Sequence, residues 1–232
     1  MPTGPMLAVG DVHGCADELD AMLRAGEAEG VARAILVGDL FTRGPDPAGV
    51  WSLLRGRIAA GTLDATLGNH DQRLLDSIDG KRPDDTHAHA VIAALDAADP
   101  AWRAWLRARP LFIDLDGVRP VPFVVVHAGV HPVGGRAGTT RSMALKMRRW
   151  PRHSADGPFW WQVYTGPHGV VYGHDAARGH IRVERDGEPW IIGLDTGCVY
   201  GGALTGWLIE EDRLLREPAR RAYAQWETQQ AP

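Results

Sequence analysis

The chain has 232 residues, of which 44% are hydrophobic, and its 25 basic and 29 acidic side chains give a formal net charge of −4. This length and apolar content predict one domain with a substantial core, spanning residues 1–232, and exclude a disordered or fibrous chain. The acidic balance argues against broad nucleic-acid binding, so any affinity for phosphate must come from a local site.

The sequence also favours a soluble, cytoplasmic protein. No run approaches the roughly 18 consecutive apolar residues of a membrane helix, and the first basic side chain is Arg24, so the charged start of a signal peptide is missing. The two cysteines, Cys15 and Cys198, lie beside glycine-rich turns and cannot form a disulfide framework, which fits a reducing compartment. We therefore expect no membrane partner.

The first part of the chain repeats a strand, loop and helix pattern. Apolar runs at 6–9, 34–37 and 63–67 each lead into a glycine and are followed by helical spacing near 17–23, 50–58 and 74–75. Repeated βα units predict a largely parallel sheet. An alanine-rich helical segment then covers 88–109 and is broken at Pro100.

Strands dominate the second part of the chain. Two hairpins are predicted, 111–115 with 121–127 through Asp116-Gly117, and 181–184 with 190–194 through Asp186-Gly187. A last pair, 203–209 and 213–217, is expected to complete a second sheet. Between the hairpins, residues 132–168 are poorly patterned and predict only one helix, near 143–148.

Side chains that can bind metal ions follow the predicted strands. They are Asp11, His13, Asp39, Asn69, His127 and His174. In an open α/β sheet, the edge formed by the carboxyl ends of the strands is where sites form. Carboxylate, imidazole and amide donors without a thiolate suit Mn, Mg, Fe, Co or Zn. Six such ligands are too many for one tetrahedral zinc ion and fit a pair of ions.

Five segments around these residues resemble, in order, the motifs of the calcineurin-like metallophosphoesterases. The segments are Gly10-Asp11-Val12-His13-Gly14, Gly38-Asp39-Leu40-Phe41-Thr42-Arg43-Gly44, Gly68-Asn69-His70-Asp71, His127-Ala128-Gly129 and Gly173-His174. The resemblance spans roughly residues 6–210. It implies an α/β fold, a four-layer α/β/β/α sandwich of two mixed β-sheets flanked by helices. Each motif alone is weak, but five in the family's order are specific.

The resemblance also implies a dinuclear centre. Asp11, His13 and Asp39 would bind the first ion, and Asp39 would bridge to a second ion held by Asn69, His127 and His174. Manganese is the expected metal, with Fe, Zn, Co and Mg as alternatives. Two such ions would generate a bridging hydroxide for attack on phosphorus.

Three further roles are predicted around the metals. Arg43 would bind phosphate oxygens in bidentate fashion, unless it pairs with Asp46. His70 would be the general acid, or else a brace for the metal loop. Arg148 or Arg149 would supply a second phosphate clamp, although a solvated helix face explains them equally well.

The predicted substrate is a phosphoanhydride in a small nucleotide. Thr42 stands where the protein phosphatases of the family carry an aspartate that pairs with the catalytic histidine. Asp71 and the segment Leu194–Gly202 resemble the symmetrical bis(5'-nucleosyl)-tetraphosphatases and the ApaH-like phosphatases. We therefore expect cleavage of diadenosine tetraphosphate to two ADP. The alternatives are a Ser/Thr protein phosphatase, an enzyme acting on polyphosphate or capped RNA, and a catalytically dead phosphate-binding module.

Aromatic side chains give a weaker signal. Trp160 or Trp161 could stack on a nucleobase, but aromatic residues more often belong to the core. The oligomeric state is not predicted.

Overall fold

Five strands form the first sheet of the computed structural model, which describes residues 4–152 and 154–225. Their order is β10 (Arg213–Pro218), β9 (Ala203–Leu208), β1 (Met6–Val9), β2 (Arg33–Leu36) and β3 (Leu63–Ala65). β1, β2 and β3 run parallel, as predicted. The expectation that the last two strands complete the second sheet was wrong, because β9 pairs antiparallel with β1. Every residue of β9 is buried, which its place between β1 and β10 explains.

The second sheet also has five strands. Their order is β4 (Phe112–Leu115), β5 (Phe123–Val126), β6 (Gly169–Tyr172), β8 (Glu188–Gly193) and β7 (Ile181–Arg185). Both predicted hairpins are confirmed, as β4 pairs antiparallel with β5 and β7 with β8. β5, β6 and β8 are parallel to one another. The sheet is therefore mixed, with three parallel strands at its centre.

Helices connect and cover the strands. They are α1 (Ala16–Ala28), α2 (Pro47–Ala59), α3 (Asn69–Ile78), α4 (Thr86–Ala98), α5 (Ala101–Arg107) and α6 (Arg141–Lys146), with short 3₁₀ turns η1 (Arg136–Gly138), η2 (Trp160–Gln162) and η3 (Ala176–Arg178). The break at Pro100 separates α4 from α5, as predicted. Within residues 4–152 and 154–225, no helix combines the length and apolar character needed to cross a bilayer.

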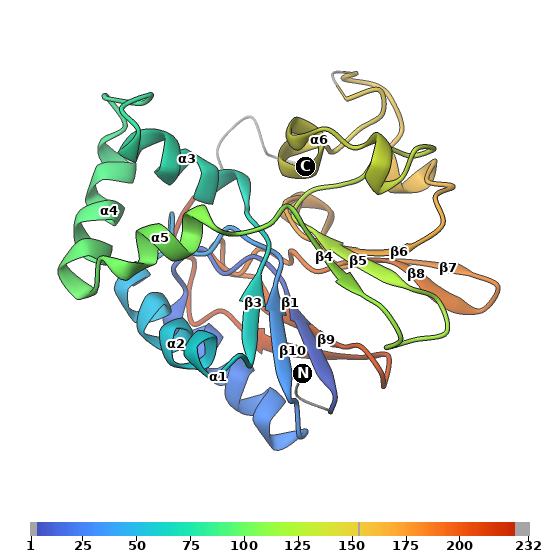
Figure 1. The fold of residues 1–232 in the computed structure, drawn as a ribbon, viewed down its shortest axis with the longest axis horizontal. Coiled ribbons are helices and arrows are strands. Elements are labelled where there is room, and N and C mark those ends of the chain that lie inside the picture. Colours follow the sequence, from blue (N-terminus) through green and yellow to red (C-terminus); the bar gives the residue numbers. More distant parts are fainter. Residues whose placement is uncertain (1–3, 153, 226–232) are drawn as a thin grey trace.

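The alternation of side chains along each strand sorts the core into three layers. Ala8 and Ile35 of the first sheet face Val125 and Val171 of the second sheet, in a shared inner layer. The opposite face of the first sheet packs against α1 to α5. The opposite face of the second sheet packs against α6 and the residues around Trp160. Figure 1 shows α1 to α5 on one side of the molecule and α6 on the other. The predicted four-layer sandwich is confirmed.

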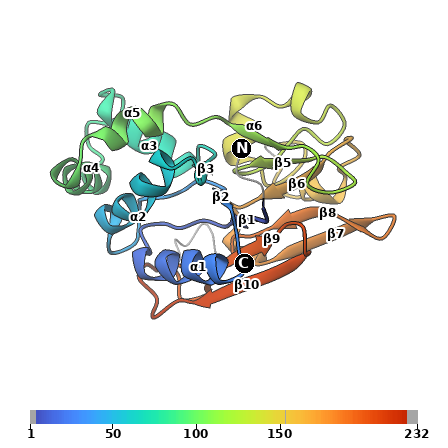
Figure 2. The same cartoon turned by 60° about the horizontal axis from the view of Figure 1, so that its bottom comes forward.

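The topology brings the parallel strands of both sheets to one edge. Figure 2, a view turned by 60° from that of Figure 1, shows the two sheets stacked face to face. The loops after β1, β2 and β3 leave the first sheet at the carboxyl ends of these strands, and the loops after β5, β6 and β8 leave the second sheet in the same way. These six loops carry the residues described below.

Candidate metal centre and active site

One cluster of potential metal ligands comes from the loops after β1 and β2. A carboxylate oxygen or ring nitrogen of each of Asp11, His13 and Asp39 lies within 4.8 Å of the others, and all three residues are buried. His13 Nε2 is 3.6 Å from Asp39 Oδ2. Asp11 also accepts the backbone N–H of His174 at 3.1 Å, which links this cluster to the second sheet. The predicted ligands of the first ion therefore lie together.

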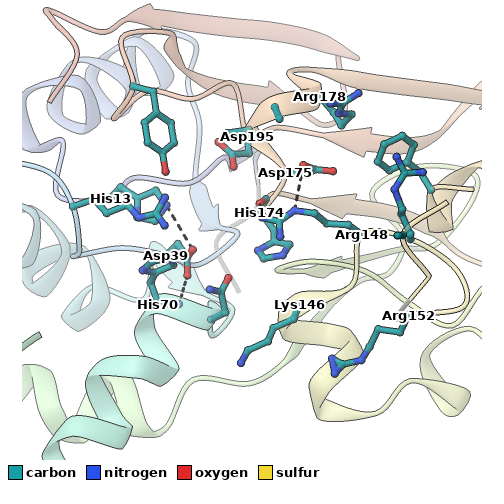
Figure 3. Close-up of a pocket in the computed structure, with 18 of the residues that line it drawn as sticks. His13, Asp39, His70, Lys146, Arg148, Arg152, His174, Asp175, Arg178 and Asp195 are labelled. Atoms are coloured by element: carbon teal, nitrogen blue, oxygen red, sulfur yellow. Dashed lines mark hydrogen bonds and ion pairs between the residues drawn. The ribbon is translucent and has the colours of Figure 1, made fainter. Parts of the chain in front are cut away.

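A second cluster shares Asp39 with the first. Ligand atoms of Asp39, His127 and His174 lie within 4.8 Å of one another, and His127 Nε2 is 3.5 Å from Asp39 Oδ2. Asn69 Oδ1 lies 2.8 Å from the same His127 nitrogen. All six predicted ligands are thus assembled at one place, and Asp39 lies between the two groups. Figure 3 shows His13, Asp39, His70 and His174 gathered at this centre.

The surroundings of the His127 and His174 rings suit the second cluster to a metal ion. His127 Nδ1 lies 3.0 Å from the carbonyl oxygen of Val37, so a neutral ring donates there and directs the lone pair of Nε2 into the centre. That lone pair faces the amide oxygen of Asn69, so these two acceptors need either a cation that both would bind or a turned Asn69 amide. His174 Nε2 is buried and has no hydrogen-bond partner among the described residues. These atoms fit the coordination sphere of a divalent ion.

Burial and crowding keep the candidate histidine ligands neutral, and they destabilise the charged form of the candidate carboxylate ligands as long as no cation is nearby. Burial lowers the pKa of His127 to about 4 and holds the pKa values of His13 and His174 well below the usual range, so the rings are neutral ligands. Burial raises the pKa of Asp39 to about 7, and burial with nearby carboxylates raises the pKa of Asp11. Without a cation these carboxylates repel one another, and two divalent ions would relieve that repulsion.

The backbone around the centre is strained. His13, Asp39, Arg43 and His174 all have positive φ angles, between 47° and 72°, a region that side-chain-bearing residues rarely adopt. The loop before His174 also needs a glycine, because a Cβ on Gly173 would lie 1.9 Å from Asp11 Oδ1. Such strain persists only where the surroundings fix the chain, and it is typical of functional sites.

Asp71 fixes two of these loops without facing the cavity. Its carboxylate accepts the backbone N–H groups of Asp39 at 2.8 Å, Leu40 at 3.0 Å and Gly68 at 3.0 Å, and the residue is fully buried. The side chain therefore ties the loop after β2 to the start of α3. The sequence drew attention to Asp71 only through the resemblance, and the structure gives it a positioning role.

His70 and Thr42 lie next to the centre but apart from each other. The backbone N–H of His70 donates to Asp39 Oδ1 at 2.8 Å, and its ring meets the ring of His13 edge to face at 5.1 Å. His70 Nδ1 is buried with no hydrogen-bond partner among the described residues. The Thr42 hydroxyl lies 3.3 Å from His13 Nδ1 instead. Accordingly, Thr42 orients a ligand of the first cluster rather than the candidate acid.

A cavity of about 620 Å³ opens over the metal ligands, a size typical of small-molecule sites. Among the described residues, six basic side chains line it: Arg43, Lys146, Arg148, Arg149, Arg152 and Arg178. The guanidinium of Arg148 donates to the His174 carbonyl at 3.0 Å and pairs with Asp175 at 3.3 Å. The Arg43 guanidinium lies 5.6 Å from the centre of the Tyr200 ring, while Asp46 caps α2 through Gly49 N–H. The three predicted arginines thus all reach the cavity.

Sequence reasoning missed several cavity residues. Asp195 is buried, lines the cavity and follows β8 by two residues, the same position that Asp11 occupies after β1. That repeated spacing was the available signal. Lys146, Arg152 and Arg178 lie in irregular or short elements and carried no such signal. Trp160 is 1% exposed in the core and cannot stack on a base, and Trp161 stacks on Phe159.

Comparison with known proteins decides the family. The model of the calcineurin-like phosphoesterase family matches residues 4–196, most of the chain. The chain belongs to the calcineurin-like phosphoesterase family. The resemblance seen in the five motifs is confirmed, and with it the expectation of a hydrolase.

Individual members of the calcineurin-like phosphoesterase family narrow the comparison. The chain is 28% identical to a symmetrical bis(5'-nucleosyl)-tetraphosphatase of Aeromonas hydrophila, over 90% of this chain and 96% of that protein. It is also 28% identical to the asymmetrical bis(5'-nucleosyl)-tetraphosphatase PrpE of Halalkalibacterium halodurans, over 92% of this chain and 93% of that protein. A crystal structure provisionally assigned to a diadenosine tetraphosphatase superposes with a TM-score of 0.75 at 29% identity, covering 94% and 96%. These two relatives, one of each cleavage type, have the same identity to the chain.

Proposed function

We propose that this phosphoesterase hydrolyses bis(5'-nucleosyl)-tetraphosphates and cleaves diadenosine tetraphosphate symmetrically into two ADP. The observation that carries the proposal is the pair of buried ligand clusters joined through Asp39, at the base of a cavity with six basic side chains. A polyanionic substrate suits this combination, since the chain as a whole is acidic. The tetraphosphatase names of the relatives support the same substrate class.

Two divalent ions would be bound, with manganese as the first expectation. One would be held by Asp11, His13 and Asp39. The other would be held by Asp39, Asn69, His127 and His174. When bound, such a pair supplies an activated water nucleophile and neutralises charge on the phosphoryl group. Arg43 and Arg148 would bind the non-bridging phosphate oxygens, because a guanidinium matches two of them at once. The bonds from Arg148 to His174 and Asp175 orient it toward this task. Arg149, held by the Gly157 carbonyl, adds positive charge further along.

His70 is the proposed general acid. Hydrolysis forms a new P–O bond to the water oxygen and breaks the bridging P–O bond, and the leaving oxygen takes up a proton when it is a poor leaving group. Burial lowers the pKa of His70 far below the usual range, and among the described residues no carboxylate bonds its ring to offset this. The ring is therefore neutral at neutral pH in the free protein, a state that suits an anhydride, whose leaving nucleotide is already a stabilised anion and leaves without a proton. It suits a serine alkoxide poorly, which disfavours the protein-phosphatase alternative.

Two parts of the proposal are argued from the sequence alone: which phosphoanhydride bond is cleaved, and where in the cell the enzyme acts. Symmetrical cleavage follows the resemblance of the segment Leu194–Gly202, whereas relatives of both cleavage types match the whole chain. Cytoplasmic location follows from the cysteine usage, and both cysteines are free thiols in the structure. Polyphosphate and capped RNA remain alternatives that the same chemistry would serve.

Product analysis tests the proposal. Manganese-loaded protein is given diadenosine tetraphosphate, products are separated by chromatography, and the Asp39→Asn variant serves as the blank. ADP as sole product supports symmetrical cleavage, whereas AMP with ATP would show the asymmetrical reaction. Intact dinucleotide, from protein that still hydrolyses nitrophenyl phosphate, would overturn the proposed substrate while leaving the phosphoesterase site in place.

A further inference from the structure

Three of the six basic residues in the cavity have no role in the proposed function, which uses only Arg43, Arg148 and Arg149. Lys146 ends α6, Arg152 follows six residues later, and Arg178 belongs to η3 after β6. We call these three residues the distal basic cluster. Figure 3 shows Lys146 and Arg152 across the cavity from His13 and His70. All three residues therefore line the same cavity as the candidate metal ligands, on the side away from His13 and His70, with Arg178 apart from Lys146 and Arg152.

Two members of the distal basic cluster, Arg152 and Arg178, make contacts with uncharged groups. Arg152 donates to the Ser142 carbonyl at 3.3 Å and to the Ser142 hydroxyl, both uncharged partners. The Arg178 guanidinium lies 5.3 Å from the centre of the Phe159 ring. Within the described part of the chain, none of the three forms an ion pair with a carboxylate within 4.0 Å, and only Arg178 lies close enough to a carboxylate, that of Asp175, for its charge to lower the pKa of that group. By contrast, the neighbouring Arg148 is paired with Asp175.

Positive charge is concentrated here against the trend of the molecule. The chain carries a net charge of −4, yet the cavity is bordered by six basic side chains and only three carboxylates among the described residues, Asp39, Asp175 and Asp195. Two of these carboxylates lie at the metal end. Like charges that face a shared cavity repel one another, and an anion with several charges relieves that repulsion. The distal basic cluster thus fits a ligand that continues away from the metal end as a polyanion.

We propose that the distal basic cluster binds phosphate groups beyond the scissile one, so that the enzyme selects substrates by the length of their phosphate chain. The inference rests on the proposed function, because it takes the scissile phosphoryl group to lie at the metal ligands. A monoester would occupy the metal end alone and gain nothing from the cluster. A tetraphosphate would span both ends of the cavity.

Competitive inhibition tests chain-length selection without requiring a dinucleotide to be cleaved. Hydrolysis of nitrophenyl phosphate is inhibited either by AMP or by the β,γ-methylene analogue of ATP, with free manganese held constant. The analogue carries two further phosphoryl groups that resist cleavage of the terminal bridge. We expect it to inhibit the unmodified protein at least about tenfold more strongly than AMP, because each added charged hydrogen bond contributes about 1.5 kcal/mol or more.

The decisive comparison uses the double variant Lys146→Gln with Arg152→Gln. We define the advantage of the triphosphate analogue as the inhibition constant of AMP divided by that of the analogue. In the double variant this advantage is expected to fall about tenfold, which corresponds to the loss of one to two charged contacts. Arg136→Gln is the matched control, since Arg136 lies in the same irregular segment but is exposed and pairs with Asp114. The single variant Lys146→Gln, at an exposed helix end, guards against misfolding of the double variant.

Each outcome has a separate meaning. An unchanged advantage in the double variant, or an equal loss in Arg136→Gln, would overturn the distal basic cluster as a phosphate site. A reduced advantage together with intact diadenosine tetraphosphate would keep the cluster and reject the proposed function. The same comparison with GMP and the β,γ-methylene analogue of GTP shows whether the base contributes. If the double variant loses the advantage with the adenine nucleotides only, selection by the phosphate chain is also contradicted.

Discussion

The two sides of the cavity are built in different ways. The metal side consists of short side chains on the loops that directly follow parallel strands, and these side chains are buried, with Asp39 at 2% exposed and His127 at 0%. The basic side consists of long side chains from α6, η3 and the segment between them, and the Arg148 side chain is 39% exposed. Rigid strands fix the first side, whereas the second is held by contacts such as that of Arg152 with Ser142.

This difference separates the tasks of the two sides. Metal ions require ligand atoms placed within a few tenths of an ångström, which short side chains on strained, buried loops provide. A phosphate chain tolerates more variation, because long basic side chains can follow it. We therefore expect changes on the metal side to remove catalysis, and changes on the basic side to alter which substrate is preferred.

The largest expected effect is on the residue shared by both ligand clusters. Asp39→Asn removes a negative charge between two predicted cation sites, so activity on any phosphate ester should fall about a thousandfold or more. Metal analysis should show fewer than two ions bound per chain. Asn at the exposed Asp84 is the control for the same chemical change. Activity near that of the unmodified protein, with two bound ions, would break the assignment of a shared ligand.

A second test asks whether the metal side also supplies the proton. His70→Ala should slow esters with poor alkyl leaving groups by about a hundredfold, the usual contribution of a general acid, but nitrophenyl phosphate much less. The rate ratio between the two esters is the measurement. An equal loss for both esters would show that His70 only supports the loop, through its N–H bond to Asp39.

Arg43 belongs to the loop after β2 and is expected to have an intermediate effect. Arg43→Lys keeps the charge but loses the planar pair of donors, so KM for nitrophenyl phosphate should rise about tenfold while kcat changes less. Arg33→Lys, which alters an arginine paired with Asp64 away from the cavity, is the control. A KM unchanged in Arg43→Lys would mean that Arg43 contributes charge alone or only packs against Tyr200.

The same contrast explains what the sequence could predict. The ligands after β1, β2 and β3 were found because a buried apolar run, a glycine and a polar donor follow one another directly in the chain. Asp195 follows β8 by two residues, as Asp11 follows β1, but Leu194 separates it from Gly193, and the sequence did not predict it. Lys146, Arg152 and Arg178 could not be found this way, since their positions depend on how an irregular segment folds back over the second sheet.

Strand partners were the other limit. The pattern of β9 and β10 correctly predicted two strands, but not that β9 would pair with β1. A strand carries its burial pattern in its own residues, whereas the choice of neighbour depends on contacts far along the chain. The sheet at the amino-terminal end was therefore predicted with three strands and has five.

The smallest effect concerns the stability of the metal-free protein. Burial raises the pKa of Asp195 to about 7, because the folded state disfavours the charged carboxylate. In the unfolded chain the pKa is near 4. The contribution of Asp195 to the free energy of unfolding is therefore fully present below pH 4 and is lost as the pH rises through 7. Asp195→Asn removes this loss, and the chelated variant should be more stable than the chelated parent by about 1 to 2 kcal/mol at pH 8 but not at pH 4. Thermal unfolding at both pH values measures the difference, and added manganese should shrink it by stabilising the parent. A stability difference between parent and variant that does not change with pH would contradict this. It would show that the charged form of Asp195 is not destabilised in the folded protein, and that the carboxylates on the metal side repel one another less than their closeness indicates.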